Sequence, residues 1–167
     1  MIITERLVLE PFTKDDIDLL MEIEHDPSNS IYIWTNTREE HIEELDNPDV
    51  WTLAAKRKED GYIVGYLIAN LDLESEWMEL KRIAFREKNQ GYGREMINAM
   101  LKKAFEDMKL NKVWLEAYSD NNVGRHLYES IGFKIDGILR QHHKEDRGIM
   151  DQVQYSMLKG EYESLKI

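Results

Sequence analysis

WMELKRIAFREKNQGYGREMINAMLKKAF, residues 77–105, decides the fold of the whole chain. Its first part, residues 77–85, is rich in the aromatic and branched side chains typical of a strand. From residue 94 onward the apolar residues recur at helical spacing. The period changes at Gly91-Tyr92-Gly93, so the stretch predicts a strand, a tight turn and a helix that begins inside the turn.

This turn predicts a phosphate site. Glycine allows backbone dihedrals closed to other residues and brings bare N–H groups close to a ligand, and a helix N-terminus adds partial positive charge. A glycine pair between strand and helix is also ordinary turn chemistry. A dinucleotide fingerprint would need glycine at Met96, and a P-loop would need Gly-Lys-Ser/Thr after four spacer residues; both are absent from the sequence.

Two segments carry a resemblance to a known family. KNQGYG, residues 88–93, resembles the pyrophosphate loop [QR]-x-x-G-x-[GA] of the GNAT superfamily of acyl-CoA N-acetyltransferases, with a lysine that keeps the charge but not the forked donor geometry. NNVGRHLYESIGF, residues 121–133, resembles the family's N-x-x-[AS]-x-x-[LF]-Y-x-x-x-G-F, with Gly124 at the small position. The opening TERLVL and both closing strands are similar to the branch that includes ribosomal-protein-alanine and spermidine N-acetyltransferases.

The resemblance implies an α/β (α+β) GNAT fold in a single domain, residues 1–167. Its sheet would be central, mixed, mostly antiparallel and twisted, with helices on both faces in the order β-α-α-β-β-β-α-β-α-β-β. The sequence patterns fit this order. They predict strands at 3–12, 50–56, 62–71, 77–85, 112–117, 133–139 and 151–158, and helices at 13–24, 37–45, 94–108 and 122–131.

Composition limits both mechanism and partners. Because the chain has no cysteine, an acetyl group cannot pass through an enzyme-bound cysteine thioester, which favours direct transfer in a ternary complex. The 33 acidic against 22 basic residues disfavour nucleic-acid and anionic-membrane partners and favour cationic molecules, although such charge also serves solubility alone. With no signal-peptide pattern and no apolar run of membrane-spanning length, a cytoplasmic protein is expected.

The family's chemistry points to two catalytic candidates. By resemblance, Tyr128 lies near the sulfur as general acid; a tyrosine packed in the core is the alternative. Glu79 is the candidate base for the acceptor ammonium, directly or through a water, and a carboxylate paired with a neighbouring cation is the alternative. Simple alternation places Glu79 on the face of Ile83 and Phe85, whereas a bulge of the kind common in the family would change that assignment.

Acetyl-CoA is the expected co-substrate, and no metal is expected. The residues expected to bind it are Ile83, Ala84, Phe85, Lys88, Gln90, Gly91, Tyr92, Gly93, Arg94 and Asn121. Tyr32 and Trp34 would line the substrate pocket beside the acidic residues of 39–44. The acceptor would be a cationic amine, either a protein N-terminus or a small polyamine. A non-catalytic acyl-CoA-binding module is the alternative, and the closing strands could pair across a homodimer.

Overall fold

A single eight-stranded sheet, in the order β1-β2-β3-β4-β5-β6-β8-β7, organises the computed structural model, which describes residues 1–165. Neighbouring strands are antiparallel except β5 and β6, which are parallel. The strands are β1 (Ile2–Ile3), β2 (Leu7–Pro11), β3 (Val50–Arg57), β4 (Ile63–Asp72), β5 (Trp77–Phe85), β6 (Lys112–Tyr118), β7 (Lys134–Glu145) and β8 (Gly148–Leu158).

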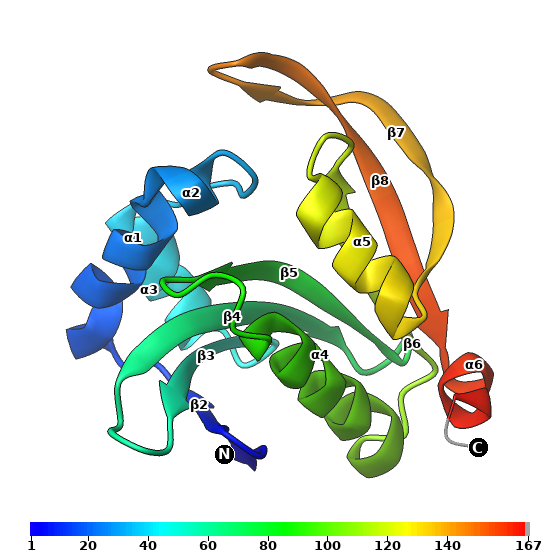
Figure 1. Ribbon diagram of the computed structural model, residues 1–167, viewed down its shortest axis with the longest axis horizontal. Coiled ribbons are helices and arrows are strands. Elements are labelled where there is room, and N and C mark those ends of the chain that lie inside the picture. Colours follow the sequence, from blue (N-terminus) through cyan, green and yellow to red (C-terminus); the bar gives the residue numbers. More distant parts are fainter. Residues whose placement is uncertain (166–167) are drawn as a thin grey trace.

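Helices cover both faces of the sheet (Figure 1). One face carries α4, with Met96, Ile97 and Met100 in the larger apolar core, together with α5. The other face carries α1, with Leu20 and Ile23 in a smaller core. The helices are α1 (Ile17–His25), α2 (Pro27–Ser30), α3 (Arg38–Asp46), α4 (Tyr92–Lys102), α5 (Asn122–Ile131) and α6 (Lys159–Ser164). The predicted fold class is therefore confirmed.

The parallel strands β5 and β6 part soon after they meet. Their pairing covers only Trp77–Glu79 against Lys112–Trp114. Beyond Glu79, β5 continues to Phe85 with no partner strand on the β6 side among the described residues. The sheet is thus open between its two central strands, and the backbone edge of β5 is free for a ligand.

A bulge in β5 corrects the prediction from simple alternation. Ile68 of β4 pairs with Arg82, but the next residue pairs with Leu80, so Lys81 is the extra residue. Met78 and Leu80 belong to the core under α4, as do Ile83 and Phe85 after the bulge. Glu79 therefore points to the opposite face, toward α1 and α3.

Several predicted boundaries also change. The first strand is split into β1 and β2 by the turn at Thr4–Leu7, and Asp26 caps a one-turn helix, α2, which is absent from the predicted elements. The last hairpin is longer than predicted, because β7 and β8 continue beyond the sheet core, and α6 was not predicted. Among residues 1–165, no helix is long and apolar enough to cross a membrane.

Candidate active site

A pocket of about 1450 Å³ fills the opening between β5 and β6. Its lining comes from both faces of the sheet, with Ile97 and Leu127 on the α4 side and Asn36 and Glu44 on the α3 side. Every predicted site residue lines it: Glu79, Tyr128, Ile83, Ala84, Phe85, Lys88, Gln90, Gly91, Tyr92, Gly93, Arg94, Asn121, Tyr32 and Trp34. The structure brings together residues that lie almost a hundred positions apart in sequence.

The glycine turn enters α4 as its sequence predicts. Gly91 is the N-cap of α4 and has a φ of 79°, a left-handed conformation that favours glycine. At Gly93 a Cβ would lie 3.2 Å from Leu127 of α5, so a side chain there would crowd the packing of the two helices. Gly91 and Gly93 both line the pocket, so the N-terminus of α4, with its unpaired N–H groups, borders it.

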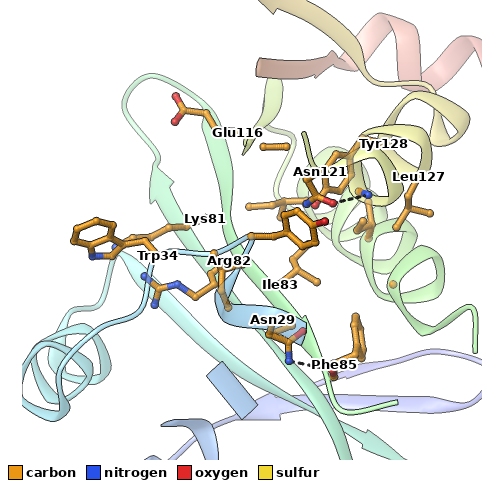
Figure 2. A pocket seen from close by; sticks show the side chains of 18 of the residues that line it. Asn29, Trp34, Lys81, Arg82, Ile83, Phe85, Glu116, Asn121, Leu127 and Tyr128 are labelled. Atoms are coloured by element: carbon orange, nitrogen blue, oxygen red, sulfur yellow. Dashed lines mark hydrogen bonds between the residues drawn. The ribbon is translucent and has the colours of Figure 1, made fainter. Parts of the chain in front are cut away.

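Lys88 is held by a residue that the sequence does not single out. Its ammonium donates to Asn29 Oδ1, and Asn29 Nδ2 donates to the carbonyl oxygens of Ile23 and Phe85 at 2.9 and 3.1 Å. Figure 2 shows this amide against the end of β5. Burial lowers the pKa of Lys88 below its ordinary value. Asn29 thus fixes both the end of β5 and the cation of the loop.

Tyr128 and Asn121 face the pocket from α5 (Figure 2). Asn121 Oδ1 accepts from the Gly124 N–H at 3.0 Å, which caps the helix and leaves the amide N–H groups for a ligand. Tyr128 packs against Phe133 and Tyr155, at ring-centroid distances of 6.3 and 6.0 Å. Burial raises the pKa of Tyr128 to about 12. Within residues 1–165 its hydroxyl has no hydrogen-bond partner, so it remains a protonated, available donor.

Glu79 lies on the opposite wall, facing α3. Asn70 Nδ2 donates to its Oε2 at 2.7 Å, and burial raises its pKa above the ordinary value, with the negative charge of Glu116 adding to the rise. Glu116, on β6, also lines the pocket, and no pattern in the sequence distinguishes it from other strand carboxylates. A carboxylate with a raised pKa is better suited to accept a proton near neutral pH.

The tip of the β7–β8 hairpin reaches across to the segment between α2 and α3. The ring centroids of Trp34 and His143 are 5.1 Å apart, and the Arg147 guanidinium lies 5.7 Å from the ring centre of Tyr32. Arg147 also pairs with Asp120 after β6. The two predicted substrate residues therefore form one wall with this hairpin, to which His143 also contributes.

A buried charged cluster supports the α3 side of the pocket. Glu24 accepts from the Tyr66 hydroxyl at 2.8 Å and from Arg82 Nη1 at 3.1 Å, and His41 Nε2 lies 3.2 Å from its other oxygen. Glu44 lies 3.4 Å from His41 Nδ1. Glu24 and His41 are almost completely buried. The cluster joins α1 and α3 to the bulged part of β5.

His41 should make stability depend on pH. Burial alone would lower its pKa, but the hydrogen bond to Glu24 and the negative charges of Glu24 and Glu44 raise it above the ordinary value. The stabilisation from its protonated form is complete below the unfolded pKa of about 6.5 and is lost as pH rises through the folded pKa. Urea unfolding between pH 6 and 9 should show this decline in the native chain and not in His41→Gln. The exposed-site variant His126→Gln should follow the native curve; an equal decline in His41→Gln would contradict the assignment.

The pocket joins the N-terminus of α4 and an unpaired strand edge on one side to a cluster of carboxylates on the other. A helix N-terminus suits an anionic group, and a cluster of carboxylates suits a cation. The family match agrees: the sequence model described as "Acetyltransferase (GNAT) domain" matches residues 6–134. The chain belongs to the GNAT acetyltransferase family.

Individual relatives agree with this assignment. An uncharacterized N-acetyltransferase, p20, from Bacillus licheniformis is 24% identical, over 95% of this chain and 96% of its own. A GNAT-family acetyltransferase from Bacillus anthracis superposes with a TM-score of 0.80 at 22% identity, covering 95% of this chain and 98% of its own. A dodecameric spermidine N-acetyltransferase from Vibrio cholerae gives a TM-score of 0.81 at 18% identity, covering 97% and 99%. The predicted superfamily and enzyme class, an acetyl-CoA-dependent N-acetyltransferase, are confirmed.

Proposed function

We propose that the chain transfers an acetyl group from acetyl-CoA directly to a primary amine, in a ternary complex at the opening between β5 and β6. The observation that carries this proposal is the splay of these strands, which places Tyr128 on one side of a single pocket and Glu79 on the other. A donor and an acceptor that enter from opposite faces of the sheet meet there. Their orientation in one complex removes the entropic cost of a bimolecular encounter.

The donor would bind mainly through the main chain. The pantetheine arm would lie along the unpaired edge of β5 at Ile83–Phe85, with the Asn121 amide as a side-chain donor. Its pyrophosphate would accept from the N–H groups of residues 90–94, beside the Lys88 ammonium. Asn29 already donates to the Phe85 carbonyl, so the arm would use the other polar groups of this edge.

The reaction needs a neutral amine and a protonated leaving group. Glu79, with its raised pKa, would take the proton of the bound ammonium, directly or through a water. The amine nitrogen would attack the thioester carbonyl, and collapse of the intermediate would break the C–S bond. The Tyr128 hydroxyl would donate to the departing sulfur as general acid, and the second proton lost by the acceptor nitrogen would restore this hydroxyl through solvent. The products are an N-acetylated amine and CoA with a free thiol.

The acceptor would be a cationic amine, because carboxylates dominate the α3 side of the pocket. The acidic side chains there are Glu40, Glu43, Glu44, Asp49, Glu79 and Glu116. Of the nearby cations, Lys81 is paired with Glu44 and Arg82 with Glu24, so neither cancels the field of the remaining acids. Tyr32 and Trp34 add aromatic faces that suit an ammonium or its alkyl chain. Both a protein N-terminal amine and a small polyamine fit this chemistry.

Product analysis tests the proposal and separates it from a non-catalytic acyl-CoA-binding module. Purified protein would be mixed with acetyl-CoA and, separately, spermidine and short peptides that begin with Ala or Ser, and products identified by mass spectrometry. Acetylspermidine or an acetylated peptide terminus would establish the transfer and identify the acceptor class. If acetyl-CoA stabilises the protein against unfolding but none of the tested amines gives an acetylated product, the binding module would be favoured. No binding of acetyl-CoA would contradict both.

Replacing Glu79 by Gln should change the pH profile of the reaction. Without a base, only acceptor that is already neutral reacts, so kcat/KM should fall about 100-fold near neutral pH. The remaining rate should increase up to the pKa of the free amine, about 10.4 for a side-chain-type amine. Glu116→Gln is the matched control, a nearby carboxylate that should affect the acceptor KM more than kcat. An unchanged pH profile in Glu79→Gln would exclude the base role.

A further inference from the structure

The N-terminal segment Thr4–Leu7 contacts the glycine turn, although 84 positions separate Arg6 from Gln90. Arg6 Nη1 donates to the Gln90 carbonyl at 2.9 Å, and its guanidinium lies 4.8 Å from the ring centre of Tyr92. The position of a Cβ on Gly91 would be 3.3 Å from Arg6 Nη2. Arg6 therefore packs directly behind the loop, on the side away from the pocket.

Glu95, in the first turn of α4, holds Arg6 in this position. Its Oε2 accepts from Arg6 Nε at 2.7 Å, and its Oε1 accepts from the Arg6 backbone N–H at 2.7 Å and from the Thr4 hydroxyl at 2.5 Å. The Glu95 carboxylate is mostly buried, at 14% side-chain exposure. A guanidinium fork is needed to reach the carboxylate and the Gln90 carbonyl together.

The bond to Gln90 fixes the direction of the next N–H group. In a planar trans peptide the carbonyl of one residue and the N–H of the next point in opposite directions. With the Gln90 carbonyl held toward Arg6, the Gly91 N–H points the other way, into the pocket. Asn89 and Gly91 both have positive φ, at 60° and 79°, so left-handed residues lie on both sides of Gln90, and the bond from Arg6 holds the carbonyl between them.

We infer that Arg6, locked by Glu95, is a positioning residue that orients the Gly91 N–H toward the pyrophosphate of acetyl-CoA and adds positive charge behind it. This inference rests on the proposed use of acetyl-CoA. It assigns a function to the opening T-E-R segment that the catalytic roles leave unused. Arg6 touches neither the acyl group nor the acceptor, so its effect is confined to the part of the donor that carries the pyrophosphate.

The test compares two donors, one of which lacks the pyrophosphate. In Arg6→Gln, the Kd of acetyl-CoA measured by calorimetry should rise about tenfold, since a partly exposed charge-assisted contact is lost. The Kd of S-acetylpantetheine, followed by NMR titration, should not change. Arg6→Lys should recover only part of the loss. Arg38→Gln is the matched control: this arginine pairs with Asp18 far from the loop, and its side-chain exposure of 46% matches the 45% of Arg6.

Each outcome has one meaning. A selective loss of acetyl-CoA affinity supports the inference, and Glu95→Gln should reproduce it in the same direction. Equal weakening of both donors in Arg6→Gln would mean that Arg6 supports only the fold, and no change in either would mean that the loop orients itself. Both of these overturn the inference. If the native chain binds neither donor, the proposed function itself fails, and this result differs from any effect of the Arg6 substitution.

Discussion

Replacing Tyr128 by Phe is expected to lower kcat by about 100-fold to 1000-fold while the affinity for acetyl-CoA persists. The hydroxyl is the only group removed, and it has no partner in residues 1–165 whose loss would disturb the fold. The ring keeps its contacts with Phe133 and Tyr155. The substitution therefore removes an interaction made only as the C–S bond breaks, which lowers kcat and kcat/KM together.

Steady-state kinetics with the acceptor identified by product analysis measures this effect, and calorimetry measures the retained Kd. Tyr62→Phe is a suitable control, since Tyr62 is a half-exposed tyrosine just before the strand β4 whose hydroxyl accepts from Arg86 at 3.1 Å, outside the pocket. It should leave kcat unchanged. A Tyr128→Phe variant with native kcat would show that Tyr128 is a packing residue, which is the alternative that its motif leaves open.

Glu24→Gln is expected to give the largest loss of stability, about 3 to 5 kcal/mol in the free energy of unfolding. Burial alone would raise the pKa of Glu24, but the His41 hydrogen bond and the Arg82 charge hold it below its ordinary value. The carboxylate therefore stays ionised inside the protein. A neutral amide would leave the buried Arg82 guanidinium without its counter-charge. Against a typical total stability of about 5 to 15 kcal/mol, this is a large fraction.

Urea unfolding of the single and double variants tests this account. Glu24→Gln combined with Arg82→Met should be less destabilised than the sum of the two single variants, because the second substitution removes the charge that the first leaves unpaired. Glu59→Gln, in the exposed turn between β3 and β4, should change stability little. Strictly additive losses in the double variant would show that Glu24 and Arg82 are not energetically coupled.

The sequence predicted the sheet, the glycine turn and the residues of the pocket because each has a local pattern. Strand and helix periods locate β5 and α4, and the two motifs place Gly91 and Tyr128. The face occupied by Glu79 could not be predicted, since a bulge at Lys81 depends on how β4 pairs, which is not a local property. The length of the β7–β8 hairpin was underestimated because polar residues continue both strands past the core.

The site residues that the sequence did not predict were all missed for the same reason. Asn29, Arg6 and Glu116 act through contacts with positions far away in sequence, and their residue types are common on any surface. For Arg6 the sequence offers the opening motif Thr4-Glu5-Arg6, but this motif indicates a function only together with the contact between Arg6 and the glycine turn. The buried charges of Glu24 and His41 were likewise invisible, because charged residues on helices are normally read as solvent-facing.

In the proposed reaction, the splay of β5 and β6 separates recognition of the donor from recognition of the acceptor, and the two sides use different chemical groups. On the donor side, the free strand edge and the α4 terminus offer mainly backbone groups, whose presence does not depend on which side chains the sequence carries. On the acceptor side, the walls are side chains from α3, the aromatic segment and the hairpin tip. Substitution there changes the acceptor while the donor site is retained, so one scaffold can acquire a new substrate by a few replacements on a single face.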